Sequence, residues 1–187
     1  MNSNDLSNKA KNIKAVVFDG DGVFFTGRVL VDSGGERLKE RSHIDGQGIS
    51  LLRAAGLLVA LVSAESTGFL EAVGEKLNNL PSVKKGEWPP VGVFTGPLGK
   101  EKIKTIDHWL KEHGVDWSEC AYMGDDMGDY EILKKVGFTA APAQAEEVIK
   151  KVCMFIAERR GGDGAIRDLA NLILEAKGVD ITTLKLR

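Results

Sequence analysis

The sequence is poor in the residues that mark disulfide-rich, zinc-binding and membrane-spanning proteins. Only two cysteines occur among its 187 residues, Cys120 and Cys153, with no Cys-x-x-Cys pair, which argues against a disulfide framework or a zinc site. The most apolar stretch, residues 54–64, is about half the length that spans a bilayer. Residues 1–14 are polar and hold no apolar core of a signal peptide. We therefore expect a soluble, cytoplasmic protein with no membrane partner.

The charge of the chain shows little bias as well. A net charge of −2 at pH 7 gives no general attraction for nucleic acid or acidic membranes. The basic residues are scattered and not interleaved with the three tryptophans, so we expect no nucleic-acid partner. A chain of this length suits one domain, which can bury roughly 70% of its unfolded surface. We expect a flexible tail over residues 1–12 and a single domain over residues 13–187.

Short apolar runs alternate with amphipathic helical stretches along the chain. Such runs suit strands buried on both faces of a parallel sheet, and strands that alternate with helices imply right-handed crossovers. The sequence thus predicts an α/β fold with a doubly wound parallel sheet. The expected strands cover residues 15–18, 58–62, 92–94, 120–123 and 138–140, and the expected helices cover about 47–55, 67–78, 100–113, 127–136, 144–151 and 164–177.

Two segments interrupt the alternation. Residues 28–41, with glycines at the turn, read as a β-hairpin that projects from the sheet beside the end of the first strand. Residues 78–90 hold Pro81, Pro89 and Pro90, which predict an irregular excursion rather than a helix.

The notable polar residues follow the apolar runs. Open parallel sheets form their sites outside the carboxyl ends of the strands, so these side chains are expected to meet at one edge. They are Asp19 and Asp21 after the first run, Ser63 and Glu65 after the second, Lys100 after the third, and Asp125, Asp126 and Asp129 after the fourth.

This set of side chains suits phosphoryl transfer to a carboxylate. Clustered acids repel one another and favour a bound divalent cation, and ligands that are all oxygen favour Mg²⁺ over zinc. The metal would let an anionic nucleophile approach an anionic phosphate. A second carboxylate two residues on could protonate the leaving oxygen and then activate water. Ser63 and Lys100 would bind the phosphoryl oxygens.

Each motif alone has a plainer interpretation. Asp19 and Asp21 could form a turn or part of a calcium loop, although an EF-hand needs flanking helices and a strand precedes Asp19. Asp125 and Asp126 could be a solvated turn or a helix cap. The hydroxyl alone could be a core residue and the lysine alone a surface residue. Their joint placement after successive strands favours the catalytic interpretation.

With these motifs, the chain resembles the haloacid dehalogenase superfamily. Within it, the resemblance is to the capless phosphatases of 3-deoxy-manno-octulosonate 8-phosphate and of nonulosonate 9-phosphates. The first and fourth motifs occur across the superfamily, whereas the hairpin and the late glycine-rich stretch are more specific to this branch. The stretches that carry the resemblance are Phe18-Asp19-Gly20-Asp21-Gly22-Val23, Gly34-Gly35-Glu36, Asp45-Gly46-Gln47-Gly48, Gly124-Asp125-Asp126 with Asp129, and Arg159-Arg160-Gly161-Gly162-Asp163-Gly164.

The resemblance implies a role for each site residue. Asp19 would be the nucleophile and a ligand of Mg²⁺. Asp21 would be the general acid/base, with its backbone carbonyl on the metal, and Asp125 would be the third protein ligand. The supports behind these ligands would be Asp126 and Asp129, and the phosphate-binding residues would be Ser63 and Lys100.

The resemblance also implies assembly. Members of this branch form tetramers through the hairpin, and a tail of one subunit covers a neighbour's site. Residues 160–164 would be that tail, so that Arg160 would meet the substrate carboxylate of an adjacent subunit; the alternative for Arg160 is a solvated turn before a helix. Residues 78–90 are longer than the family norm and could form a rim loop that changes selectivity or the contacts between subunits.

Two residues favour a nonulosonate 9-phosphate, that of KDN or an N-acylneuraminate, as the small-molecule substrate. Glu65 stands where the octulosonate enzymes carry arginine, and it can accept hydrogen bonds from substrate hydroxyls. Lys76 follows at the spacing of the nonulosonate branch, although it also reads as a surface helix residue. The alternatives are an octulosonate 8-phosphate phosphatase of lipopolysaccharide synthesis and an inactive oligomerisation module of a cytidylyltransferase system, which the retained carboxylates disfavour.

Overall fold

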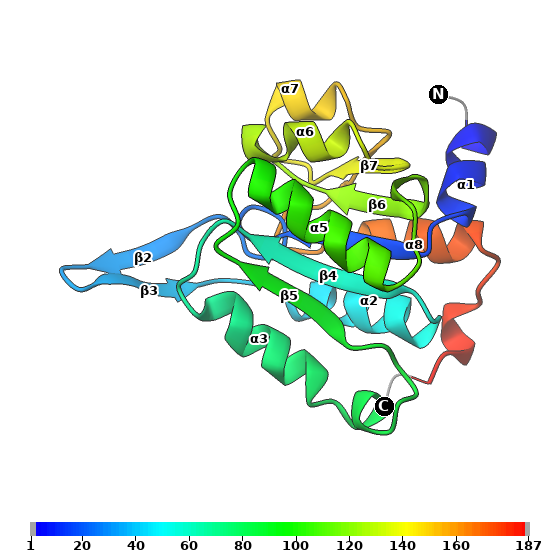
Figure 1. The fold of residues 1–187 in the computed structure, drawn as a ribbon, viewed down its shortest axis with the longest axis horizontal. Coiled ribbons are helices and arrows are strands. Elements are labelled where there is room, and N and C mark those ends of the chain that lie inside the picture. Colours follow the sequence, from blue (N-terminus) through cyan, green and yellow to red (C-terminus); the bar gives the residue numbers. More distant parts are fainter. Residues whose placement is uncertain (1–2, 186–187) are drawn as a thin grey trace.

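A parallel six-stranded sheet forms the centre of the structure, which is a computed structural model that describes residues 3–185 (Figure 1). The strand order is β5-β4-β1-β6-β7-β8, so the first strand lies inside the sheet between the second and fourth strands of the prediction. The strands are β1 (Ala15–Asp19), β4 (Leu58–Ser63), β5 (Val91–Thr95), β6 (Cys120–Met123), β7 (Phe138–Ala141) and β8 (Phe155–Ile156). The last of these was not predicted.

Strand β1 shows why the short apolar runs form strands. All five of its residues are buried. Val16 and Phe18 pack into one hydrophobic cluster, and Ala15 and Val17 pack into a second cluster on the opposite face. A strand whose two faces are both covered needs apolar side chains at every position, which explains the continuous run.

Helices cover both faces of this sheet, which confirms the doubly wound α/β prediction (Figure 1). One face is covered by α1, α2, α3 and α8, and the other by α5, α6 and α7. The bounds are α1 (Ser3–Lys11), α2 (His43–Ala54), α3 (Phe69–Asn78), α5 (Lys100–Glu112), α6 (Tyr130–Leu133), α7 (Glu147–Lys150) and α8 (Ala165–Ala176). Helices α6 and α7 are shorter than predicted, and a 3₁₀ turn, η2 (Met127–Asp129), precedes α6. Within residues 3–185, no helix is both long enough and apolar enough to cross a membrane.

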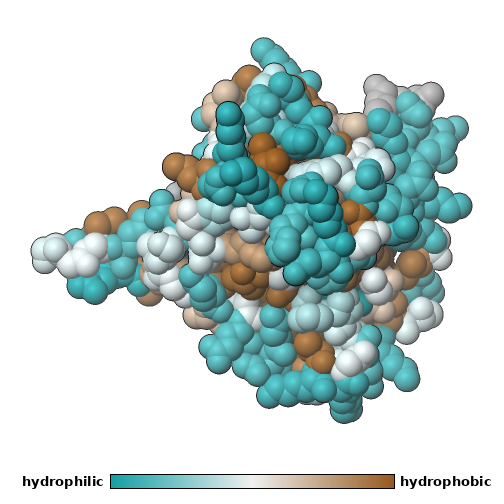
Figure 2. All heavy atoms as spheres, viewed as in Figure 1, coloured by the Kyte–Doolittle hydropathy of each residue, from teal (hydrophilic) through white to brown (hydrophobic). Residues whose placement is uncertain are grey.

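The predicted hairpin is present and projects from the carboxyl edge of the sheet (Figure 1). It consists of β2 (Val29–Asp32) and β3 (Gly35–Lys39), which pair antiparallel in a separate two-stranded sheet. Three of its apolar side chains, Leu30, Val31 and Leu38, are 60–65% exposed. Figure 2 shows these hydrophobic atoms on the projection.

The expected flexible tail over residues 1–12 is wrong for the part that the structure describes, because Ser3–Lys11 form α1. Ala10 is fully buried, and Leu6 and Ile13 belong with it to the hydrophobic cluster that α8 also enters. The ammonium of Lys177 donates to the carbonyl of Lys11 over 2.8 Å. Tertiary packing therefore stabilises a helix that is too short and polar to be predicted alone.

The segment over residues 78–90 differs from its prediction in two ways. It contains a short helix, α4 (Pro81–Lys84), which begins at a proline, a residue tolerated in the first turn of a helix. The segment leads into the amino end of β5, so it lies at the edge of the sheet opposite the expected site. The buried Arg53 holds it by donating to the carbonyl of Pro89 over 2.7 Å. A rim loop that changes selectivity is thus excluded within one subunit.

Candidate active site

Four loops at the carboxyl edge of the sheet surround a cavity of about 180 Å³. Parallel strands end at the same edge, so β1, β4 and the loop after β6 deliver their polar side chains to one place. The lining includes Asp19, Asp21, Ser63, Glu65, Lys102 and Asp126. The structure therefore brings together most of the predicted site residues, and Lys102 is an addition.

Three carboxylates form a group that could hold a metal ion. Asp19, Asp125 and Asp129 each offer an oxygen, and these oxygens lie within 4.8 Å of one another. All the donors are hard oxygen atoms on largely buried side chains, which suits Mg²⁺ and not a thiolate-bound metal. The group contains the two predicted side-chain ligands, Asp19 and Asp125, while the backbone carbonyl of Asp21 stays a predicted ligand.

Asp129 is the fully buried member of this group and has several partners. One of its oxygens accepts from the Tyr122 hydroxyl at 2.5 Å and from the Lys102 ammonium at 2.9 Å. Its other oxygen accepts from the backbone N–H of Asp125 at 2.9 Å. These three bonds fix Asp129 and, through it, the backbone of Asp125. The supporting role of Asp129 stays a prediction, since its oxygen also belongs to the group that could hold the metal.

The lysine of the site is Lys102, and the prediction of Lys100 is wrong. Lys100 is exposed at the start of α5 and does not line the cavity. Lys102 is buried, and its ammonium donates to the Asp19 carboxylate as well as to Asp129. One turn further, Ile106 continues the buried face of α5. The sequence could have identified Lys102, because it lies on the apolar face of an amphipathic helix. A lysine that is buried there needs a carboxylate partner to compensate for the loss of hydration.

Burial and mutual repulsion disturb the acids of this cluster. Burial raises the pKa of Asp19 well above its usual value, and the negative charges of Asp129 and Asp125 raise it further. The positive charge of Lys102 lowers this pKa but does not outweigh the other effects. Burial, with Asp129 and Asp126 nearby, raises the pKa of Asp125 to about 7. Burial alone would lower the pKa of Lys102, but the charges of Asp19 and Asp129 raise it. A dication bound among these carboxylates would relieve the repulsion.

Asp21 lies at the mouth of the cavity with its side chain 31% exposed. The ammonium of Lys39, from β3 of the hairpin, donates to its two carboxylate oxygens at 2.8 and 3.0 Å. Ser63 Oγ lies 3.4 Å from Asp21 Oδ2 and accepts from the backbone N–H of Glu65 at 3.1 Å. The hairpin was expected beside the end of the first strand, but its contact with Asp21 was not predicted.

Two glycines permit the close approach of the catalytic loop to its neighbours. A Cβ on Gly20 would lie 2.7 Å from Ser63 Cβ. Gly22 has φ +81°, and a Cβ there would lie 2.0 Å from Asp125 Oδ2. Side chains at these positions would push apart the loops that carry the acids.

Glu65 and Asp126 lie at the rim of the same cavity, and both are exposed. Asp126 caps the turn η2 by accepting from the backbone N–H of Gly128 at 2.8 Å. The plainer interpretation of Asp126 as a cap thus applies together with its place beside the metal group. Glu65 is free to meet a substrate that enters the cavity.

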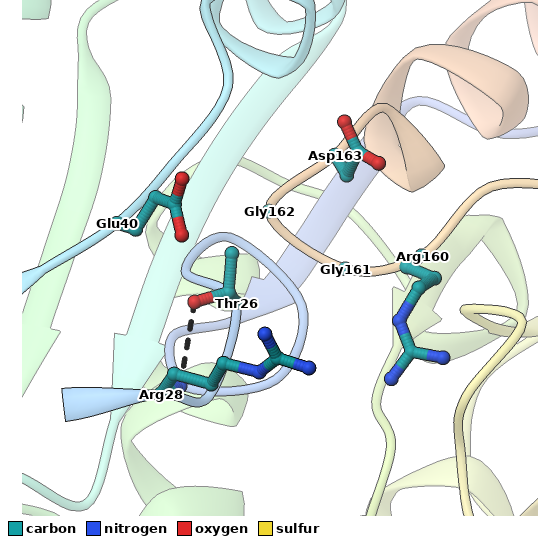
Figure 3. A pocket seen from close by; sticks show the side chains of 7 residues that line it. All are labelled: Thr26, Arg28, Glu40, Arg160, Gly161, Gly162 and Asp163. Atoms are coloured by element: carbon teal, nitrogen blue, oxygen red, sulfur yellow. Dashed lines mark hydrogen bonds between the residues drawn. The ribbon is translucent and has the colours of Figure 1, made fainter.

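Two predicted selectivity residues lie elsewhere in the subunit. Lys76 is exposed on α3 and lines a different cavity with Arg41 and Gln47. Arg160 is exposed beside another cavity of about 270 Å³, across from Arg28 (Figure 3). Neither residue lines the carboxylate cavity of its own chain.

Residues 160–164 form a turn inside the chain, and their contact with a neighbouring subunit stays a prediction. The turn joins β8 to α8, whose apolar face is buried in the core. It packs behind the catalytic loop of the same chain: Gly162 N donates to Val23 O over 2.8 Å, and a Cβ on Gly161 would lie 1.7 Å from Gly22 O. The glycines are needed for this contact.

Asp45 gives a structural reason for the stretch Asp45-Gly46-Gln47-Gly48, which is part of the family resemblance. It is fully buried on α2 and accepts from the backbone N–H groups of Gly164 and Ile166 at 2.9 and 3.0 Å, at the start of α8. Gly48 allows the two helices to approach, because a Cβ there would lie 3.0 Å from the Cα of Arg167. Asp45 therefore anchors the turn that supports the catalytic loop.

The fold and the site together define an α/β enzyme with an aspartate-rich, metal-binding centre. The family model of haloacid dehalogenase-like hydrolases matches residues 11–168, and the chain belongs to this family. The predicted superfamily and the predicted enzyme class, an aspartate-based phosphoric monoester hydrolase, are thereby confirmed.

Known relatives cover nearly the whole chain. The 3-deoxy-D-manno-octulosonate 8-phosphate phosphatase KdsC of Haemophilus influenzae is 31% identical over 174 residues, which are 92% of this chain and 89% of the relative. The same phosphatase of Moraxella catarrhalis, solved with magnesium ion, phosphate ion and a KDO molecule, is 26% identical with a TM-score of 0.82, over 95% of this chain and 94% of that one. The phosphatase of Yersinia pestis has a TM-score of 0.85 at 25% identity, over 98% of this chain and 91% of that one.

Proposed function

We propose that this protein is a Mg²⁺-dependent phosphatase that removes the phosphate from 3-deoxy-D-manno-octulosonate 8-phosphate. The observation that carries the proposal is the buried group of Asp19, Asp125 and Asp129 with Lys102 on Asp19, in a chain similar over nine-tenths of its length to an octulosonate phosphatase. Both cysteines are free, which suits the reducing cytoplasm where we place the protein.

The reaction proceeds in two steps. A carboxylate oxygen of Asp19 attacks phosphorus and forms an aspartyl phosphate while the bond from phosphorus to the sugar oxygen breaks, and Asp21 gives a proton to that oxygen. Water then attacks the phosphorus, Asp21 takes its proton, and Asp19 and phosphate are released. The ammonium of Lys102 stabilises charge on the phosphoryl oxygens. Mg²⁺ on the carboxylate group, when bound, neutralises phosphate charge.

The octulosonate replaces the nonulosonate as the preferred substrate. The nonulosonate preference rested on Glu65 and Lys76, and only Glu65 lines the carboxylate cavity of the subunit. The named relatives act on octulosonate 8-phosphate. Lys76 therefore no longer supports a nonulosonate 9-phosphate as the substrate. The similarity to the octulosonate phosphatases favours the eight-carbon acid.

Phosphate release from a panel of substrates tests this assignment. We expect the highest kcat/KM on octulosonate 8-phosphate, lower values on KDN and N-acetylneuraminate 9-phosphates, and loss of activity with EDTA. A higher kcat/KM on either nine-carbon substrate would reverse the substrate assignment. Asp19→Asn should abolish turnover while the circular dichroism spectrum stays unchanged, and surviving turnover would exclude the aspartyl phosphate.

We also propose that the protein assembles as a homotetramer through its hairpin. Leu30 and Leu38 present apolar surface on a two-stranded projection that its own chain does not cover. Isolated hairpins are marginal in water, so a partner would stabilise this one. Light scattering should give the mass of four chains, and Leu30→Glu should lower it. A monomeric wild-type protein at micromolar concentration would contradict the assembly without touching the chemistry.

A further inference from the structure

The hairpin sends one basic side chain into the active site. Most of β3 is exposed, yet the side chain of its last residue, Lys39, is only 3% exposed. Its ammonium lies 5.9 Å from the ring centres of both Phe25 and Phe69. A second carboxylate, Glu36, lies 3.5 Å from the ammonium. A lysine held between two rings and two acids has few positions to choose from.

The Asp21 carboxyl depends on this lysine for its orientation. Lys39 Nζ donates to both oxygens of Asp21, at 2.8 and 3.0 Å. The other side-chain contact of this carboxyl in the described chain, from Ser63 Oγ, is 3.4 Å long. Lys39 makes two shorter bonds and joins opposite charges, whereas Ser63 makes one long bond, so Lys39 dominates the restraint on Asp21.

We propose that Lys39 is a positioning residue that aims the Asp21 carboxyl at the oxygen of the leaving sugar. Each carboxylate oxygen has two lone pairs, so an oxygen that accepts from Lys39 can still exchange a proton with the leaving group. Proton transfer requires hydrogen-bond reach between the acid and that oxygen, and a carboxyl that rotates freely would seldom meet this condition. The inference rests on the proposed function, in which Asp21 is the acid.

Substrates with different leaving groups distinguish a residue that positions the general acid from one that binds phosphate or stabilises the fold. A sugar alkoxide leaves only with a proton from the acid, whereas p-nitrophenolate leaves without one. Lys39→Met keeps the apolar stem and removes the charge. We expect the single-turnover rate at which octulosonate 8-phosphate phosphorylates Asp19 to fall about 100-fold, the lower end of the contribution of a general acid, and the corresponding rate with p-nitrophenyl phosphate to fall less than about threefold. The phosphorylation step is compared because Asp21 also acts as the base in the second step, which both substrates share.

Three further variants act as controls. Arg37 lies on the same face of β3 but pairs with Asp32 away from the site, so Arg37→Met should leave both activities unchanged. Lys39→Arg, which keeps a cationic donor, should recover part of the lost turnover. In an Asp21→Asn background, Lys39→Met should add little further loss, because the two residues act as one unit.

The possible failures are distinct. An equal loss of the phosphorylation rate with both substrates would assign Lys39 to phosphate binding or to the fold and overturn the inference. A higher KM with unchanged kcat would make it a substrate-binding residue and also overturn it. A wild-type protein that cleaves p-nitrophenyl phosphate but not octulosonate 8-phosphate would instead refute the proposed function. The same comparison would then be made with whichever alkyl phosphate of the panel is turned over.

Discussion

Replacing Lys102 by methionine is the sharpest test of the site, because it separates the lysine that the structure identifies from the one that the sequence suggested. The Lys102 side chain is 7% exposed, and its partners Asp19 and Asp129 are 12% and 0% exposed. Solvent screens this cluster little, so the figures for buried pairs apply. Removing one partner of such a pair costs about 3–5 kcal/mol of unfolding free energy. Mg²⁺ should reduce this loss, because it replaces part of the missing positive charge.

The effect of Lys102→Met on turnover should be at least as clear. Loss of one group that stabilises transition-state charge costs about 10²–10³-fold in kcat, or about 2.7–4 kcal/mol. Lys100→Met is the matched control two residues earlier on the same helix, where the side chain is exposed, and it should change neither stability nor kcat. Urea unfolding with and without Mg²⁺, together with phosphate release, measures both effects. If Lys100→Met lost the activity and Lys102→Met kept it, the site as described would be wrong.

Three other predictions follow from single contacts. Gly22→Ala should abolish Mg²⁺-dependent turnover, because the new Cβ would meet Asp125, whereas Gly56→Ala, with a similar φ of +82° but open space around it, should keep kcat. Burial raises the pKa of Asp45 to about 6, so the folded state binds more protons than the unfolded state from about pH 4 to 6. The free energy of unfolding should therefore fall by about 3 kcal/mol as pH rises through that window. Asp45→Asn should remove this pH dependence in urea titrations. Arg53→Met should lower the unfolding free energy by about 2–4 kcal/mol, because buried carbonyls lose their donor, while kcat stays unchanged since residues 78–90 lie at the far edge; a lowered kcat would contradict that separation.

The sequence predicted the parts of the fold that one strand or one helix determines locally. The apolar run of β1 predicts a strand buried on both faces, and the position of Asp19 at its end predicts the edge where the site lies. Ser63 and Asp125 are placed by the same rule, because each follows a parallel strand that neighbours β1. Chain topology thus suffices to gather these residues without any knowledge of side-chain contacts.

The features that the sequence did not predict are those whose structure depends on tertiary contacts. Helix α1 exists because α8 offers it an apolar surface, which no local pattern shows. The sequence pattern favoured Lys100, the first lysine after the third strand, whereas the burial of Lys102 depends on how α5 packs on the sheet. Lys39 belongs to a strand whose other residues are exposed, so its burial depends on the angle at which the hairpin leaves the sheet.

The late glycine-rich motif has a physical explanation that its sequence alone did not give. Gln144 donates to the carbonyl of Gly22 at 2.6 Å and accepts from Gly161 N at 2.8 Å, so it joins the turn over residues 160–164 to the catalytic loop. Asp45 fixes the other end of that turn at the start of α8. The loop that carries Asp21 is therefore held from behind by this turn and from the front by Lys39 of the hairpin. The two features most specific to this branch meet at one loop, and a catalytic constellation needs such restraint from its surroundings to act on a bound phosphate.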